Sequence, residues 1–155
     1  MIVLEHLLGV SKMASSAYIK LVPKSKKKTL TIDDVKELFH YYKDITSKTG
    51  QQLSWQYEES SFPYTIKENQ DGAGKWFYLK GIEDRYKMIL VGVGSQPSEN
   101  NGEDEETLSY IQITLHDQST HGDKGKANEF CKFIAKKLEA ELQLFTGKVM
   151  YFYKR

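Results

Sequence analysis

The sequence predicts an α+β fold, a two-layer sandwich with a mainly antiparallel sheet of about five to six strands and two helices on one face. Three observations lead to this prediction. Short segments alternate apolar and polar residues, two longer segments repeat apolar residues every three or four positions, and turn-forming residues separate the middle segments. Short turns join strands as hairpins, and both helices need one sheet face to bury their apolar stripes.

The first half of the chain is predicted to contain a strand, a helix and two further extended segments. Residues 17–22 (AYIKLV) alternate as a half-buried strand does. Thr31 can cap the helix that follows, and Gly50 is typical of a helix C-terminal end. The apolar stripe of this helix comprises Ile32, Val35, Leu38, Phe39, Tyr42 and Ile45. A second strand is expected over residues 53–57, and a short extended piece at residues 65–66.

The second half of the chain is predicted to contain four strands and a second helix. The strands are expected over residues 75–80, 86–93, 107–115 and 148–153. The helix is expected to begin at or near Asp123 and to end at Gly147. Its buried stripe would comprise Ala127, Phe130, Ile134, Leu138, Leu142 and Phe145. The element order is then β-α-β-β-β-β-α-β, without an internal repeat or domain boundary.

Composition and charge indicate one soluble domain. The chain has 155 residues, a length typical of a single domain, and 39% of them are hydrophobic, enough to build a core. A formal net charge of +1 provides no general attraction to nucleic acid or acidic membranes, so neither partner is expected. No apolar run reaches the roughly 18 residues of a membrane span. The single cysteine, Cys131, cannot form an intrachain disulfide, which is compatible with the cytoplasm.

The first twelve residues are interpreted as an extension that is not part of the native protein. The segment MIVLEHLLGVSK lacks the basic start and the small-residue cleavage site of a signal peptide. Met13 is followed by three small residues, which are typical of a processed start. We therefore expect Met13 to be the initiator, residues 1–12 to come from upstream sequence, and residues 13–155 to form a domain in the bacterial cytoplasm.

Two glycine-containing segments and two charge clusters are interpreted as turns. The segment GAGK at residues 72–75 lacks the spacing, the Ser or Thr and the helix that a P-loop requires. The segment GVG at residues 92–94 leads into an acidic loop, which would repel a pyrophosphate. Neither segment predicts nucleotide binding, so no cofactor is assigned. The basic cluster at residues 24–28 and the acidic cluster at residues 99–106 are expected to be solvated.

The polar loop at residues 116–123 is the first candidate site. His116, Asp117, His121 and Asp123 bring two imidazoles and two carboxylates together between a strand and a helix. Such a group can hold a metal or act as general acid and base, and a nucleophilic pairing of Cys131 with His121 is a further alternative. However, no helical i, i+4 pair of ligands is present and no third ligand is indicated, so no metal or catalytic residue is assigned. The other interpretation is a structural or helix-capping role.

Aromatic residues form the second candidate site. Trp and Tyr residues occur in pairs two positions apart on three predicted strands, so each pair shares one sheet face. The candidates are Trp55, Tyr57, Trp76, Tyr78, Tyr151 and Tyr153. If the helices cover the opposite face, these rings would form an exposed surface for a protein partner or a second copy of the chain. The alternative is a buried role in the core, because a register shift of one residue exchanges the two faces.

Four segments of the chain are distinctive as strings of residues. They are SAYIKLV, TLTIDDVKELFHYYKDITSKTG, QLSWQYEESSFPY and LQLFTGKVMYFYKR. Together they resemble a small uncharacterised protein family of Bacillus and its relatives that carries only a domain-of-unknown-function label. The resemblance covers residues 13–155. It implies an α+β cytosolic protein and transfers no site residues.

Two functions are compatible with these observations, and a third, an acid-binding or nucleic-acid accessory protein, is disfavoured by the net charge of +1. The first is a small non-enzymatic binding or interaction protein that uses the aromatic face. The alternative is a hydrolase or metal-dependent enzyme built on the polar loop at residues 116–123. If the aromatic face is exposed, replacing Trp76 and Tyr78 by serine should cost little stability and should change association or ligand binding. If both rings lie in the core, the same change should cost much stability.

Overall fold

The computed structural model describes residues 15–53, 62–68, 74–97 and 107–154, and for residues 48–53 it describes the backbone alone. The expected extension at residues 1–12 lies outside these ranges. Helix α2 spans Ile32–Leu53 and helix α4 spans His121–Leu138. The strands are β1 (Ser15–Lys20), β2 (Tyr64–Lys67), β3 (Trp76–Gly81), β4 (Met88–Pro97), β5 (Thr107–Leu115), β6 (Glu141–Gln143) and β7 (Val149–Tyr151).

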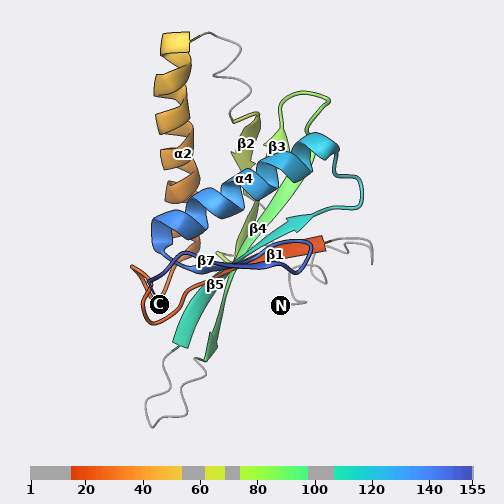
Figure 1. The fold of residues 1–155 in the computed structure, drawn as a ribbon. Coiled ribbons are helices and arrows are strands. Elements are labelled where there is room, and N and C mark those ends of the chain that lie inside the picture. The colour runs from red at the N-terminus through yellow and green to blue at the C-terminus, as the bar shows by residue number, and fades with distance from the viewer. Residues whose placement is uncertain (1–14, 54–61, 69–73, 98–106, 155) are drawn as a thin grey trace.

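All seven strands belong to one antiparallel sheet, in the order β2-β3-β4-β5-β1-β6-β7. The longest pairing joins β4 to β5 and runs from Ile89 opposite Leu115 to Pro97 opposite Thr107. Strand β1 lies between β5 and β6, so the first and last of the described strands, β1 and β7, are close in space (Figure 1). The predicted α+β fold with an antiparallel sheet is therefore confirmed, with slightly more strands than expected.

Both helices lie on the same face of the sheet (Figure 1). Val35 and Phe39 of α2 belong to one core cluster with Phe130 and Ile134 of α4 and with Ile111 of β5. Successive residues of a strand point to opposite faces, so every second residue of the central strands faces the helices. The two layers therefore bury one side of the sheet, as the sequence predicted.

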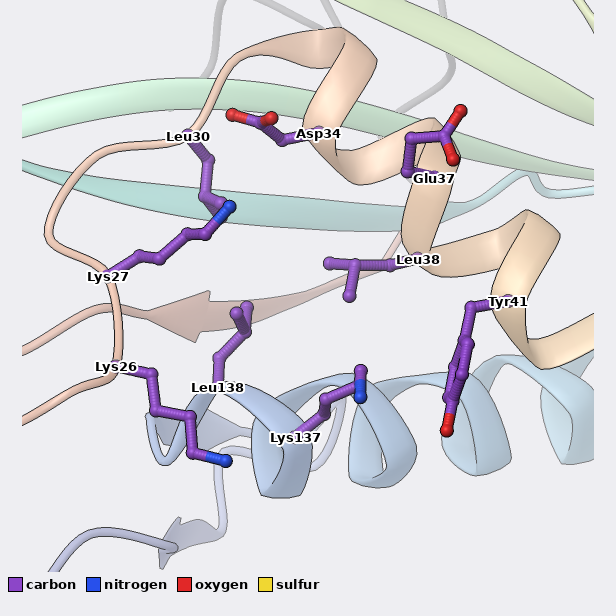
Figure 2. Close-up of a pocket in the computed structure, with 9 residues that line it drawn as sticks. All are labelled: Lys26, Lys27, Leu30, Asp34, Glu37, Leu38, Tyr41, Lys137 and Leu138. Atoms are coloured by element: carbon purple, nitrogen blue, oxygen red, sulfur yellow. The ribbon is translucent and has the colours of Figure 1, made fainter.

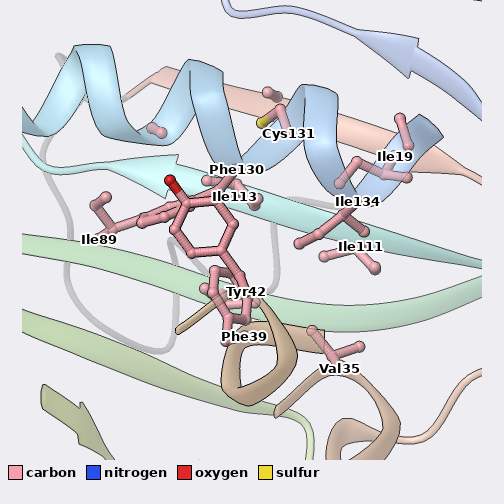
Figure 3. Close-up of a cluster of buried hydrophobic side chains, with 14 of the residues drawn as sticks. Ile19, Val35, Phe39, Tyr42, Ile89, Ile111, Ile113, Phe130, Cys131 and Ile134 are labelled. Atoms are coloured by element: carbon pink, nitrogen blue, oxygen red, sulfur yellow. The ribbon is translucent and has the colours of Figure 1, made fainter. Parts of the chain in front are cut away.

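Aromatic rings fill the centre of the core where the two helices meet (Figure 3). The ring centroid of Phe130 lies 5.4 Å from that of Phe39 and 5.1 Å from that of Tyr42, with interplanar angles of 80° and 88°. Edge-to-face contacts of this kind are favoured by the ring quadrupoles. The hydroxyl of Tyr42 donates to Glu129 Oε1 at 2.7 Å, so the buried phenol keeps a polar partner. These contacts fix the position of α2 against α4.

Each helix begins with a reciprocal pair of hydrogen bonds. At α2, the Asp34 N–H donates to Thr31 Oγ1 at 3.2 Å, and the Thr31 N–H donates to Asp34 Oδ2 at 2.9 Å. This backbone hydrogen bond lowers the pKa of Asp34. Thr120 and Asp123 exchange the same two bonds at the start of α4. Both arrangements are capping boxes, so the predicted cap at Thr31 is confirmed.

The predicted end of the second helix at Gly147 is wrong. Helix α4 ends at Leu138, and Glu139 adopts a left-handed conformation with φ 53° that directs the chain away from the helix axis. Strand β6 follows and pairs with β1, so Leu142 is buried as a strand residue. Apolar residues at helical spacing concealed this change, because Leu142 and Phe145 continue the period of α4. Gly147, with φ 91°, lies in the turn between β6 and β7.

The predicted strand at residues 53–57 is wrong at its first residue. Helix α2 continues through Gly50 to Leu53, so Gly50 does not terminate it. Trp55 and Tyr57 lie outside the described residues.

No helix in the described parts of the chain has a stretch that is both long and apolar enough to cross a lipid bilayer.

Candidate functional site

The face of the sheet that points away from α2 and α4 is called the outer face here. Its residues alternate with residues of the helix-facing core. Phe77, Ile19 and Leu142 belong to the core cluster, so Trp76, Tyr18 and Glu141 next to them point to the outer face. The outer face is therefore the side of the sheet on which the candidate aromatic residues of β3 and β7 lie.

The strand register aligns outer-face residues in two rows across β5, β1, β6 and β7. The first row comprises Tyr110, Lys20, Glu141 and Tyr151. The second row comprises Gln112, Tyr18, Gln143 and Val149. Directly opposite residues on paired strands have Cβ atoms about 4.5–5.5 Å apart, so these eight side chains form one continuous area, within which Gln112 is only 3% exposed. We call this area the tyrosine surface.

The six aromatic candidates do not form a single exposed surface. The structure does not describe Trp55 and Tyr57. Trp76 is only 4% exposed, and it packs with Leu90 and the partly buried Tyr78 in a small cluster separate from the main core. Within the described residues, the Trp76 indole N–H has no hydrogen-bond partner. Trp76 is thus on the expected face but is packed rather than open.

The other two candidates remain accessible at the β7 edge of the sheet. Tyr151 is 44% exposed, and Tyr153 packs against it edge-on with ring centroids 5.8 Å apart. Val149, on the same strand and face, is 39% exposed. Large exposed side chains on the edge strand of a sheet are typical of a contact area.

Tyr18 and Tyr110 were not among the sequence candidates, although they belong to the tyrosine surface. Their ring centroids are 6.3 Å apart at an angle of 68°. Burial, with a smaller contribution from Tyr18, raises the pKa of Tyr110. The Tyr110 ring lies over Gly94, where a Cβ atom would come within 2.3 Å of it. Their alternation with the core residues Ile19 and Ile111 was the sequence signal that could have identified both.

A polar group lies beside these rings on the outer face. The Ser16 and Thr114 hydroxyls are 2.8 Å apart, and Gln112 Nε2 donates to Ser16 Oγ at 3.1 Å. Lys20 Nζ donates to Gln143 Oε1 at 3.1 Å on the neighbouring pair of strands. These hydrogen bonds join β5, β1 and β6 and give the outer face a hydrophilic centre, unlike the helix-facing side.

The polar loop at residues 116–123 has a structural centre, Asp123. Its side chain is fully buried. It accepts a hydrogen bond from the Tyr64 hydroxyl at 2.6 Å, from the Lys87 N–H at 3.0 Å and from the Thr120 N–H at 3.0 Å. Burial, followed by the hydrogen bond to Asp123, raises the pKa of Tyr64. Asp123 therefore ties the start of α4 to β2 and to the turn between β3 and β4.

The other three polar candidates do not converge with Asp123. His116 Nδ1 lies 2.6 Å from Asp117 Oδ1 and 3.1 Å from the Gln118 N–H. Nδ1 donates to the Asp117 carboxylate when it carries a proton and accepts from the Gln118 N–H when it does not, so the two hydrogen bonds are not formed at the same time. His121 is exposed at the first residue of α4. Across the described ranges, no three His, Cys, Asp or Glu side chains are arranged to hold a metal ion.

Cys131 is placed away from the polar loop. It lies ten residues after His121 on the same helix, which corresponds to about 15 Å along the axis. The thiol is fully buried, and burial raises its pKa to about 12. Nucleophilic attack requires the thiolate, so this thiol is poorly suited to catalysis. The pairing of Cys131 with His121 that the sequence left open is not formed.

We expect Cys131 to react slowly with a thiol reagent in the folded protein. At pH 8 its thiolate fraction should be about a thousandfold smaller than in the unfolded chain, because its pKa is higher. The folded protein keeps the thiol proton up to a pKa of about 12, whereas the unfolded chain loses it near pH 9. The free energy of unfolding should therefore fall as the pH rises from 9 to about 12. Labelling rates with and without denaturant, and urea unfolding of Cys131→Ala across that pH range, test this. Equal labelling rates would contradict it.

The comparison with family models assigns the chain to a family, and no comparison names an activity. The model of the domain of unknown function DUF1885 matches residues 15–154. A crystal structure of a protein of unknown function from Bacillus stearothermophilus is 43% identical, with a TM-score of 0.51, and the match covers 82% of this chain and 92% of that one. A search of curated proteins found no significant match. The chain therefore belongs to the DUF1885 family, as its resemblance to a Bacillus family of unknown function implied.

Proposed function

We propose that this chain is a non-enzymatic interaction protein whose contact area is the tyrosine surface, occupied by a second copy of the chain. The observation that carries the proposal is that Tyr18, Tyr110 and Tyr151 lie on a sheet face that neither helix covers. Tyrosine rings combine apolar area with a hydroxyl and are frequent in protein interfaces. We also propose a cytoplasmic location, which the free thiol of Cys131 supports.

The charges of the tyrosine surface favour a second copy over other occupants. Lys20 and Glu141 are cross-strand neighbours, so both signs of charge lie side by side. Lys20 binds the neutral Gln143, and Glu141 has no ion-pair partner in the described part of the chain. In a two-fold arrangement each lysine can meet the glutamate of the other copy. A nucleic acid would instead meet the carboxylate of Glu141.

A charge swap tests this arrangement. Sedimentation velocity of the full chain over about a hundredfold range of concentration should show a monomer–dimer equilibrium. Lys20→Glu and Glu141→Lys should each weaken dimerisation by about tenfold or more, because like charges would then face each other. The double variant K20E/E141K should regain most of the lost affinity, because opposite charges meet again across the interface.

Lys67→Glu is the matched control for the charge swap. Lys67 is an exposed residue on β2, at the other edge of the sheet, so its replacement changes net charge equally and should leave dimerisation unchanged. A monomer at every concentration would refute the second copy as occupant. Dimerisation that is equally weak in the swap and in the single variants would refute the pairing of Lys20 with Glu141.

A further inference from the structure

A pocket of about 480 Å³ lies on the helix side of the molecule, where three segments meet (Figure 2). The loop between β1 and α2 contributes Lys26, Lys27 and Leu30, and α4 contributes Lys137 and Leu138. Helix α2 contributes Asp34, Glu37, Leu38 and Tyr41. The volume is within the range of about 300–1,000 Å³ that is typical of small-molecule sites.

The pocket combines apolar walls with cationic groups. Leu38 and Leu138 extend toward each other from the two helices (Figure 2). The Lys137 ammonium lies 4.1 Å from the centroid of the Tyr41 ring, a cation–π contact that holds both side chains at the pocket. Leu30 and Leu138 are buried, whereas Tyr41 is exposed. An apolar body could therefore rest on the leucines, with a polar group toward the lysines.

Hydrogen bonds at both ends hold the loop that carries Lys26 and Lys27. The Lys26 N–H donates to Leu138 O at 3.0 Å, and Ser25 Oγ donates to Glu139 O at 2.9 Å, so the loop caps the end of α4. Ser109 holds the other end of the loop, because its hydroxyl accepts from the Leu30 N–H at 2.9 Å. The lysines are thus presented from a preorganised backbone, which reduces the entropic cost of binding.

The charges of the pocket favour an anion. Asp34 accepts the Thr31 N–H at the cap of α2, where the helix dipole offsets part of its charge. The hydrogen bond from Thr31 and, to a smaller extent, the charge of Lys27 lower the pKa of Asp34, so its carboxylate stays charged. With Glu37 the pocket therefore has two carboxylates and three lysines, which leaves one positive charge in excess. For Lys26, Lys27 and Lys137, no carboxylate of a described residue lies within ion-pair distance. The Lys26 N–H also satisfies the Leu138 carbonyl, which would otherwise repel an anion.

We propose that this pocket binds a small organic anion, with its apolar body against Leu30, Leu38 and Leu138 and its anionic head at Lys27 and Lys137. This site is on the side of the molecule opposite the tyrosine surface, so it does not depend on dimerisation. Glu37, which also lines the pocket, limits the affinity for anions. The sequence did not indicate the site, because the basic cluster at residues 24–28 was interpreted as a solvated turn.

Fluorescence titration with anilinonaphthalene sulfonate, an aromatic monoanion, tests the proposal on the full chain. Lys27→Gln and Lys137→Gln should each weaken binding by roughly three- to tenfold, because each removes one positive charge near the anion. Glu37→Gln should tighten binding by about two- to threefold for the opposite reason. Lys132→Gln, an exposed lysine of α4 outside the pocket, is the matched control and should leave binding unchanged.

Displacement of the probe separates an anion site from a purely apolar one. Octanoate should displace the probe, whereas octanol, with an aliphatic chain of equal length and no charge, should be at least about tenfold weaker. Equal displacement by both compounds, absence of probe binding, or binding that is the same in all four variants would each overturn the proposal. Thermal unfolding of each variant confirms that a change in binding does not reflect a change in folding.

Discussion

Replacing Asp123 with alanine is expected to lower the free energy of unfolding by about 3 to 5 kcal/mol, because each buried donor left without an acceptor costs about 1–3 kcal/mol. The donors are the buried Tyr64 hydroxyl and the partly buried backbone N–H groups of Lys87 and Thr120. The buried Asp123 side chain thus connects α4 to β2 and to the β3–β4 turn. Urea unfolding followed by circular dichroism measures the change.

Two variants distinguish the loss of the hydrogen bonds to Asp123 from the loss of a negative charge in the same loop. Asp117→Ala removes an exposed carboxylate from the same loop and should change stability by no more than about 0.5 kcal/mol. Asp123→Asn keeps one acceptor oxygen and should fall between the alanine variant and the unmodified protein. A loss below about 1 kcal/mol for Asp123→Ala would show that the three donors find other partners or water, and that the network contributes little.

Local patterns in the sequence were sufficient to predict most of the elements. Strand β5 was expected at residues 107–115 and is found there, because Ile111, Ile113 and Leu115 alternate with the polar residues Gln112 and Thr114. The start of α2 after Thr31 was predicted because a capping residue and the apolar stripe coincide there. These elements depend on neighbouring residues, which a single sequence contains in full.

Elements that depend on distant partners could not be predicted in the same way. Strand β6 exists because Leu142 pairs opposite Ile19, more than a hundred residues earlier, while its own sequence continues the helical period of α4. The termination of α4 at Glu139 uses a left-handed conformation that is unusual for a residue other than glycine, so no sequence signal marks it.

The candidate sites were less predictable than the fold for the same reason. Asp123 was expected in a polar loop, but its role depends on Tyr64 and Lys87, which are 59 and 36 residues away in the chain. The pocket depends on the packing of a loop and two helices. The tyrosine surface could have been found, because Tyr18 and Tyr110 alternate with core residues of strands whose positions were predicted.

Gly81→Ala is expected to be the other most damaging single change, with a loss of about 3 kcal/mol or more, at the upper end for an added methyl group in a packed site. A Cβ atom at Gly81 would lie 1.9 Å from the backbone oxygen of Tyr86. Backbone atoms cannot rotate away as a side chain can, so the turn from β3 to β4 must move. The hydrogen bond from the Gly81 N–H to Lys87 O, at 2.8 Å, would be distorted with it.

Gly125→Ala is the matched control for this substitution. Gly125 lies in α4 with open space around its Cβ position, so alanine there should raise stability by about 0.5–1 kcal/mol through its helix propensity. The Gly81 and Asp123 sites are connected, because the Lys87 N–H that binds Asp123 belongs to the turn that Gly81 allows to close. The double variant G81A/D123A should therefore lose clearly less stability than the two single losses added together. Additive losses in the urea midpoints would show that the turn and the start of α4 fold as independent units.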